Sequence, residues 1–425
     1  MDRATVRFSF ISVILAVVFV AVLGMVAVWG FGASADTALA DAHTHDGSTA
    51  WTATDSLPPT AGNYYLIADV TLSSTWTVPT GTTNLCLNGH GIRMTGNNSV
   101  VTINAGATLK LYDCDTTTEH RYSLSNAKSN GAGFATVNDS LTSGYLTFKG
   151  GYVTGGRGRP INSWNRGGAL YIEGAVEMYG GTLIGNGQYG TTHGGAFNTQ
   201  GTGSFKMYGG SIQNNAAQCG GATRLQGSGS CGIYGGKIIN NIVTNDGGAI
   251  HVGGEISVIL QDCEISGNYA GNGPGAGIWM TTTGMVISGR TIITDNLTNS
   301  GESNVEIGNG YVIGVGELTD GATIGIKPQS GTGIFTSGWA TSMEDADPSD
   351  YFTSDAGYYV VSQNGEAVIT DTLPHIHSWN YTADGNVITA TCVGEGDCNL
   401  SEQTLTITAI GKTRSEEHTS ELQSR

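Results

Sequence analysis

The chain has 425 residues, of which 66 are glycine and only 12% are charged, and its formal net charge is −17. This composition suits many tight turns around a dry interior, and it disfavours long amphipathic helices, which need charged outer faces. The negative charge disfavours nucleic acid as a partner, because phosphate recognition needs a basic surface.

The first forty residues predict export. Arg3 and Arg7 precede an uncharged apolar run from Phe8 to Phe31, and small residues follow it. This layout is typical of a secretory signal peptide, and the length of the run also fits an N-terminal membrane anchor. We therefore assign residues 1–40 to a signal peptide or an anchor, which is the one expected membrane contact.

A glycine-rich motif repeats through the middle of the chain. Gly-Gly-Ala begins at positions 167, 194, 220 and 247, and a scrambled Gly-Ala-Gly begins at 275, so the spacings are 27, 26, 27 and 28 residues. Each copy precedes three short segments in which apolar and other residues alternate. Alternation with period two indicates strands with one buried face, and the regular period indicates a structural repeat.

Three short strands per repeat of about 27 residues predict an all-β fold: a right-handed, single-stranded parallel β-helix over residues 64–340. Gly-Gly-Ala then marks a turn where a larger side chain would collide with the next rung. The third strand of each repeat ends on an asparagine, and stacked asparagines can hydrogen-bond from amide to amide. These asparagines are Asn186, Asn215, Asn241, Asn268 and Asn296.

Other segments flank the predicted β-helix. Residues 41–63 are expected to lead into it, and residues 341–373 to cap it and link it onward. Residues 374–413 alternate, turn at Asp384-Gly385 and alternate again, which predicts the start of a small β-sandwich-like module.

The last residues do not look like part of this module. Within residues 414–425, RSEEHTSELQS resembles the translation of a widely used sequencing adapter. We therefore expect residues 414–425 to be an artefact and the module to be truncated near Thr413.

Two columns of outward side chains form a candidate ligand-binding face. The first contains Tyr179, Tyr208 and Tyr234, and the second contains Tyr171, Asn198, Arg224, His251 and Trp279. Spaced aromatic rings can stack on sugars or engage a protein partner. Stacked like residues can instead stabilise the sheet itself, and this alternative stays open for both columns.

Catalysis on a β-helix would need carboxylates close together on neighbouring rungs. The best candidates are Asp262, Glu264 and Asp295, which are expected at one corner. They would serve a polysaccharide lyase or a glycoside hydrolase, or bind Ca²⁺. Exposed acidic residues are common without such roles, so we expect no catalytic residues, no metal site and no cofactor beyond this weak Ca²⁺ candidate.

Seven cysteines in an exported chain favour disulfides, and the odd number leaves at least one thiol unpaired. The short loop between Cys392 and Cys398 makes these two the candidate pair. Four others are interpreted as small buried residues, of which the first two would lie on neighbouring turns. They are Cys86, Cys114, Cys219 and Cys231.

The motif GGAI followed by ISGN, at residues 247–250 and 265–268, resembles the repeats of bacterial surface β-helix proteins, including the polymorphic outer-membrane adhesins. Stretches such as HSWNYTADGNVITATC are similar to large repeat-rich surface proteins of anaerobic bacteria. The resemblance covers residues 43–410. It is specific for architecture, and it brings no catalytic residues with it.

The resemblance implies an exported adhesin or ligand-presenting stalk at a bacterial cell surface, or outside the cell. The expected partner of this monomeric rod is a glycan or a protein of a host or a neighbouring cell. Two alternatives remain. One is a polysaccharide-degrading enzyme with a pectin lyase-like β-helix, and the other is a passive spacer.

Overall fold

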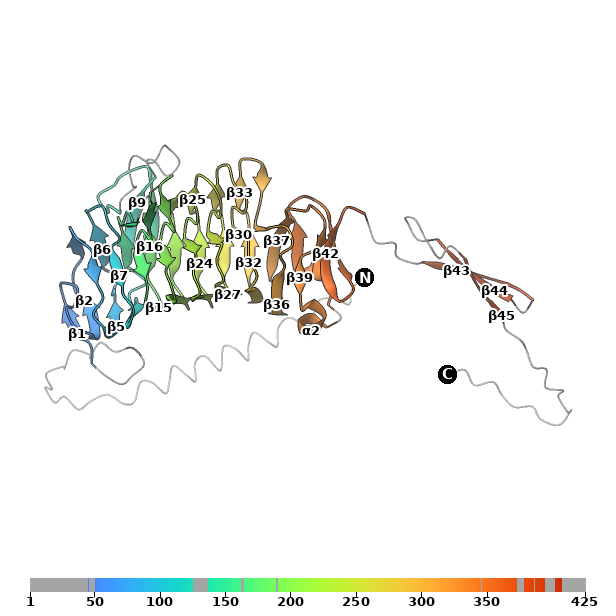
Figure 1. Cartoon of the computed structure of the whole chain (residues 1–425), viewed down its shortest axis with the longest axis horizontal. Coiled ribbons are helices and arrows are strands. Elements are labelled where there is room, and N and C mark those ends of the chain that lie inside the picture. The colour runs from blue at the N-terminus through green and yellow to red at the C-terminus, as the bar shows by residue number, and fades with distance from the viewer. Residues whose placement is uncertain are drawn as a thin grey trace, which may run out of the picture. The chain divides into compact units, whose positions relative to one another are not determined.

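The computed structural model describes residue 45 and residues 50–124, 137–161, 164–188, 190–344, 346–372, 378–385, 387–393 and 402–406. The chain divides into two compact units, Met1–Ala50 and Trp51–Arg425. The second unit contains all of the strands and helices given below. They form a β-solenoid of about ten turns, followed by a small antiparallel module (Figure 1).

The second strand of each rung belongs to one 11-stranded sheet, in which neighbouring strands are parallel. In order, these strands are β1 (Thr52–Thr54), β2 (Gly62–Leu66), β5 (Gly81–Cys86), β8 (Ala107–Tyr112), β15 (Ala175–Met178), β19 (Ser204–Met207), β23 (Ser230–Ile233), β27 (Ser257–Gln261), β31 (Met285–Gly289), β36 (Ile313–Leu318) and β39 (Thr336–Ser337).

The first and third strands of the rungs belong to a set of 18 parallel strands. The first strands are β4 (Trp76–Thr77), β7 (Val101–Ile103), β14 (Leu170–Ile172), β18 (Phe197–Thr199), β22 (Thr223–Leu225), β26 (Ile250–Val252), β30 (Ile278–Met280) and β35 (Val305–Ile307). The third strands are β3 (Val70–Leu72), β6 (Gly91–Met94), β11 (Tyr152–Thr154), β16 (Thr182–Ile184), β20 (Ser211–Gln213), β24 (Lys237–Ile239), β28 (Glu264–Ser266), β32 (Ile292–Thr294), β37 (Thr323–Pro328) and β40 (Phe352–Ser354).

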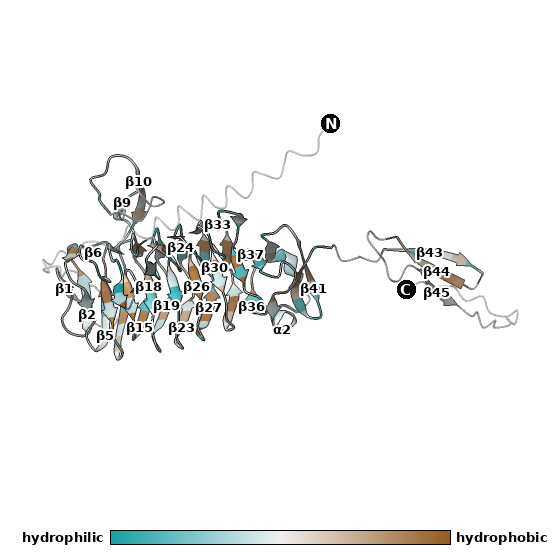
Figure 2. Cartoon of the chain, turned by 45° about the horizontal axis from the view of Figure 1, so that its top comes forward, coloured by the Kyte–Doolittle hydropathy of each residue, from teal (hydrophilic) through white to brown (hydrophobic). Residues whose placement is uncertain are grey.

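Smaller sheets decorate this solenoid. An antiparallel hairpin, β9 (Glu119–Ser123) and β10 (Tyr145–Lys149), is inserted between β8 and β11 and projects from one side (Figures 1 and 2). A second sheet contains β12 (Arg159–Ile161), β13 (Trp164–Arg166) and β17 (Thr192–His193). A third contains β21 (Ala216–Ala217), β25 (Ile242–Val243), β29 (Tyr269–Ala270), β33 (Leu297–Thr298) and β34 (Gly301–Glu302).

A helix, α2 (Trp339–Met343), and a short 3-10 helix, η1 (Pro348–Asp350), lie between β39 and β40 in the chain. A separate antiparallel sheet contains β38 (Gly333–Ile334), β42 (Glu366–Thr370) and β41 (Tyr359–Gln363). The C-terminal module is the antiparallel sheet of β43 (Trp379–Asp384), β44 (Val387–Cys392) and β45 (Glu402–Thr406). The last residue pair between β43 and β44 is Asp384 with Val387, so the chain reverses directly after Asp384. The predicted turn at Asp384-Gly385 is confirmed.

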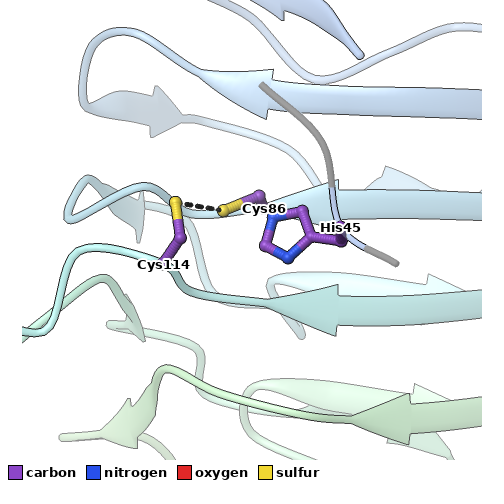
Figure 3. Close-up of side chains that lie close together, drawn as sticks. All are labelled: His45, Cys86 and Cys114. Carbon is purple, nitrogen blue, oxygen red and sulfur yellow. Dashed lines mark hydrogen bonds between the residues drawn. The ribbon is translucent and has the colours of Figure 1, made fainter. Parts of the chain in front are cut away.

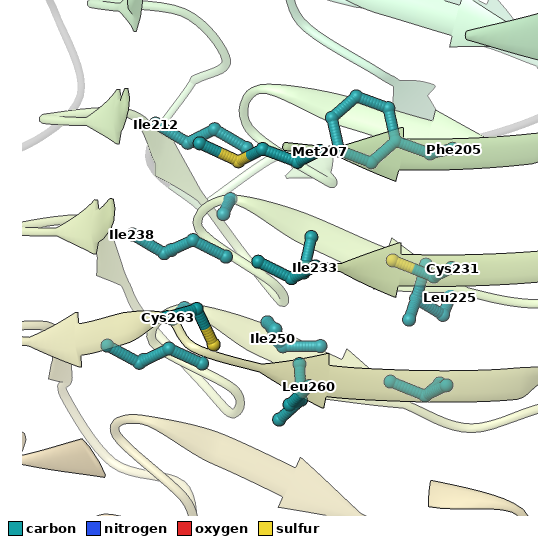
Figure 4. Close-up of a cluster of buried hydrophobic side chains, with 14 of the residues drawn as sticks. Phe205, Met207, Ile212, Leu225, Cys231, Ile233, Ile238, Ile250, Leu260 and Cys263 are labelled. Atoms are coloured by element: carbon teal, nitrogen blue, oxygen red, sulfur yellow. The ribbon is translucent and has the colours of Figure 1, made fainter. Parts of the chain in front are cut away.

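The predicted register of the repeat is confirmed. Ile250 pairs with Ile278 on the next rung and with Thr223 on the preceding rung. Alternate residues of the first and second strands are buried, as the alternation predicts, and Figure 4 shows Phe205, Ile233 and Leu260 among them in the interior. Alternation thus gives one continuous apolar core, because every strand contributes one face to it.

The Gly-Gly-Ala turn needs its two glycines for different reasons. The first glycine of each copy has a left-handed backbone, as at Gly220 (φ 66°) and Gly247 (φ 64°), where side chains are strained. The second glycine lies directly against the next rung. A Cβ on Gly221 would lie 2.1 Å from the carbonyl oxygen of Gly248. The predicted collision with the neighbouring rung is therefore confirmed for the second glycine.

The asparagine column is continuous and fully buried. Each side-chain Nδ2 donates to Oδ1 of the next asparagine, at 3.1, 2.9, 3.0, 2.8 and 2.9 Å from Asn186 to Asn304. The column ends where Nδ2 of Asn304 donates to Asp355 Oδ1 at 2.8 Å. The predicted amide ladder is confirmed, and it supplies hydrogen-bond partners to the buried side-chain amides of these asparagines.

Candidate functional site

Tyrosine rings stack along the outer face of the 11-stranded sheet. From Tyr112 through Tyr179 and Tyr208 to Tyr234, ring centroids are 4.7, 5.0 and 5.4 Å apart and interplanar angles are 6°, 15° and 16°. The predicted stacking is confirmed, and Tyr112 extends it by one rung. Because neighbouring rings cover each other's faces, this column exposes ring edges and hydroxyls. Sugars stack on open ring faces, so the column is better suited to stabilising the sheet.

The mixed column is largely covered, although we expected it to be exposed. Tyr171, Asn198 and His251 are buried, whereas Arg224 and Trp279 are partly exposed. Part of the covering comes from β12, whose Arg159 guanidinium lies 4.8 Å from the centroid of the Tyr171 ring. Strand alternation specifies which side chains point away from the core. It does not specify whether another layer covers them.

A polar cluster, which we call the corner cluster, combines this column with the residue that precedes each Gly-Gly-Ala turn. Its members are His193, Cys219, Arg224, Asp246 and His251. The preceding residues stack on successive rungs: His193 and Cys219 form a parallel β-bridge, and the Asp246 carbonyl accepts a hydrogen bond from the Gly220 N–H at 3.0 Å. The turn at Gly247 then brings His251, on β26, back beside Asp246.

The contacts within the corner cluster are short. His251 Nδ1 lies 2.6 Å from Asp246 Oδ1, and Asp246 also hydrogen-bonds the Cys219 thiol. Next to them, Arg224 Nη1 donates to His193 Nδ1 at 2.6 Å. Cys219, His193 and His251 are each buried. The cluster therefore places a thiol, a carboxylate and an imidazole together behind a nearly closed surface.

The protonation states follow from burial and from these contacts. Burial, followed by the charge of Asp246, raises the pKa of the Cys219 thiol to about 12. Burial, followed by the Arg224 charge, lowers the pKa of His193 to about 4, so its neutral ring accepts the guanidinium hydrogen bond at neutral pH. Burial opposes ionisation of Asp246, but hydrogen bonds from His251 and Cys219 hold its pKa below the usual value.

This order of contacts does not form a nucleophilic triad. A cysteine nucleophile needs an imidazole as its direct base, with a carboxylate behind the imidazole. Here the Asp246 carboxylate contacts both the thiol and the imidazole, and it makes the Cys219 thiol harder to ionise.

The three candidate carboxylates do not share one corner. Asp262 precedes β28, which contains Glu264, whereas Asp295 follows β32, the parallel neighbour of β28. Asp262 and Asp295 therefore lie at opposite ends of this strand pair, each in a left-handed turn position (φ 52° and 58°). Glu264 lies 2.6 Å from Lys237 Nζ, and this hydrogen bond lowers the pKa of the Glu264 carboxyl. A lowered pKa does not suit a general acid.

A groove of about 380 Å³ lies between the β9–β10 hairpin and the asparagine turns, and we call it the hairpin groove. The hairpin is held against these turns by the Tyr122 hydroxyl, which donates to the Asn214 carbonyl at 3.2 Å. No sequence pattern predicts the groove, because its two walls are far apart in the chain. It is lined by Leu124, Leu146, Asn214, Asn240, Asn241, Ile242, Gly267, Asn268, Tyr269, Asp295 and Leu297.

The predicted cysteine arrangement holds in part. Cys86 and Cys114 lie on neighbouring rungs, and their sulfur atoms point toward one another at 3.3 Å (Figure 3). Cys114 is exposed, which differs from the buried position we expected. Cys398 lies outside the described residues, so the candidate pair Cys392 and Cys398 stays a prediction.

No protein-family model, curated protein or solved structure matches the chain. Among the residues that the structure describes, no helix is long and apolar enough to cross a membrane.

Proposed function

We propose that the protein is an exported, bacterial cell-surface β-solenoid that acts as an adhesin and binds a neutral glycan in the hairpin groove. The groove departs from the uniform solenoid surface, and its lining combines apolar and polar groups. Leu124, Leu146 and Leu297 offer apolar surface for the C–H face of a sugar ring. Asn240 and Asp295 offer an amide and a carboxylate for its hydroxyls.

One observation carries this proposal. Asn214 is one of the residues that line the groove, and its side-chain Nδ2 is buried and has no hydrogen-bond partner within the described part of the chain. A buried donor without an acceptor is costly, at about 1–3 kcal/mol. With the Asn214 amide turned toward the groove, a sugar hydroxyl would supply the missing acceptor, so binding would remove this cost.

Charge favours a neutral ligand over an acidic one. The net charge of the chain is −17, and the groove contains Asp295 among its lining residues. Uronates and other acidic sugars would be repelled at long range by this charge. The same negative charge disfavours the alternative of a lyase that acts on acidic polysaccharides.

An array of neutral and acidic glycans, probed with the purified full chain, tests the proposal. We expect binding to neutral glycans, and we expect Leu297→Glu to weaken it at least about tenfold, since a charge in the apolar wall costs more than about 1.4 kcal/mol. Ile67→Glu is the matched control, because Ile67 is similarly exposed (53% against 47%) but does not line the groove. Equal binding by the two variants would contradict the assignment of the groove.

Other outcomes identify the alternatives. Failure to bind any glycan or mucin would favour a passive spacer. New reducing ends or unsaturated products after incubation with polysaccharides would favour an enzyme. An Asp295→Asn variant would then show whether this carboxylate takes part.

A further inference from the structure

The corner cluster brings three different metal-ligand types together. The Cys219 sulfur, an Asp246 carboxylate oxygen and a His251 ring nitrogen all lie within 4.8 Å of one another. We propose that Cys219, Asp246 and His251 form a binding site for a divalent transition metal ion of the Zn²⁺ class, with one coordination position left to water or a ligand.

The distances suit a tetrahedral ion after small side-chain rotations. Zn²⁺ binds sulfur at about 2.3 Å and nitrogen or oxygen at about 2.0–2.2 Å, which separates ligand atoms by roughly 3–4 Å. The His251–Asp246 contact of 2.6 Å has to widen by about 1 Å to admit the ion, which a change of side-chain rotamer supplies. Asp246 is the most exposed of the three, with 24% of its side chain accessible, and it gives the ion an entry path.

The backbone holds the ligands in place before the ion arrives. Cys219 and Asp246 occupy equivalent positions on adjacent rungs, and the Gly220 N–H bonds the Asp246 carbonyl at 3.0 Å. His251 is fixed on β26, which pairs with β22 and β30. Ligands on paired strands keep their spacing, so the ordering entropy of binding is small.

The donor set selects the ion. A thiolate, a carboxylate and a neutral imidazole suit Zn²⁺ and related ions, whereas Ca²⁺ and Mg²⁺ need oxygen ligands only. The two anionic ligands neutralise a dication, so the nearby Arg224 guanidinium faces a neutral centre. Cys219 binds as a thiolate, so its thiol proton is released to solvent on binding.

Cobalt titration of the full chain tests the site, because Co²⁺ reports both geometry and thiolate ligation by absorption. The Cys86 and Cys114 sulfurs are 3.3 Å apart and can also bind soft ions, so both are replaced by serine in the parent protein. We expect one equivalent of Co²⁺ to produce the visible bands of a tetrahedral ion and a near-ultraviolet thiolate band, and Zn²⁺ to displace it.

Variants distinguish this site from adventitious binding. Cys219→Ser should abolish the thiolate band, and His251→Gln and Asp246→Asn should each weaken binding at least about tenfold. Cys263→Ala is the matched control, because Cys263 is buried elsewhere in the core, and it should keep the band. Circular dichroism checks that each variant is folded.

If Cys219→Ser does not fold, protection of the Cys219 thiol from alkylation by Zn²⁺ in the parent gives the same information. Absence of a thiolate band in the folded parent, or a band that survives in His251→Gln and Asp246→Asn at unchanged affinity, would overturn the proposal.

Discussion

Removing one side chain from the asparagine ladder should destabilise the solenoid more than any other single polar substitution in it. Asn241→Ala deletes four hydrogen bonds. The Nδ2 group loses Ile212 O and Asn268 Oδ1, each at 3.0 Å. The Oδ1 atom loses two donors of Asn215, its backbone N–H at 3.0 Å and its Nδ2 at 2.9 Å.

The magnitude follows from these contacts and from burial. Four net hydrogen bonds contribute about 4 kcal/mol, and the buried Asn215 N–H left without an acceptor adds about 1–3 kcal/mol. We therefore expect a loss of about 5–7 kcal/mol in the free energy of unfolding. Domains are typically stable by only about 5–15 kcal/mol, so the variant should be close to unfolding at room temperature.

Urea denaturation measures the global loss, and hydrogen exchange measured by mass spectrometry reports the Asn215 amide directly. Asn245→Ala is the matched control, because Asn245 is exposed and its side chain lies outside the ladder. It should lower the free energy of unfolding by less than about 0.5 kcal/mol. A loss below about 1 kcal/mol for Asn241→Ala, with unchanged exchange at Asn215, would refute the argument that the ladder stabilises the turns.

Three further predictions concern single contacts. Gly221→Ala should lower the free energy of unfolding by about 3 kcal/mol in urea denaturation, because the added Cβ meets the backbone of the next rung. Gly201→Ala, with open space around it but a left-handed φ, should lower it by about 1 kcal/mol. Equal losses for the two variants would contradict the close approach of Gly221 to the next rung. Oxidised glutathione should oxidise the Cys86 and Cys114 thiols to a disulfide and be reduced to two glutathione thiols. The disulfide would be detected as a loss of about 2 Da in mass and a gain of about 3–4 kcal/mol in the free energy of unfolding. Thiols that persist under this oxidant would contradict the prediction. In an NMR titration of the folded chain, the His193 imidazole should have a midpoint near pH 4, below its ordinary pKa of 6.5. On acidification, the unfolded chain therefore takes up this proton before the folded chain does. The neutral His193 ring therefore contributes fully to the free energy of unfolding above pH 6.5, and this contribution is lost as the pH falls toward 4. A midpoint above pH 6 for the folded chain would contradict this pH dependence.

The repeat was predictable because each of its signals is local. Gly-Gly-Ala, the alternating strand residues and the terminal asparagines recur at nearly constant spacing, so aligning them places like residues in columns. The tyrosine stack and the amide ladder follow directly from this alignment, and the structure confirms both. The missed member of the stack, Tyr112, belongs to an upstream rung that lacks the Gly-Gly-Ala motif.

The candidate sites were less predictable, because they depend on contacts between columns. Asp246 and the outward residue His251 were both visible in the sequence, but their meeting depends on how sharply the turn at Gly247 folds back. The three carboxylates were placed at one corner by spacing alone, and the left-handed turns at Asp262 and Asp295 put two of them at different corners.

The sequence by itself determined the solenoid, its register and its buried column of asparagines. Each residue of a rung pairs with the residue one repeat further along the chain, so the period of the sequence gives the pairing. Only the tertiary structure decided which outward side chains stay accessible. The β9–β10 hairpin and β12 lie outside the repeat and fold back over neighbouring rungs, and nothing periodic encodes where they dock. A surface covered by such a layer is set by long-range packing, whereas the core beneath it is set by strand alternation.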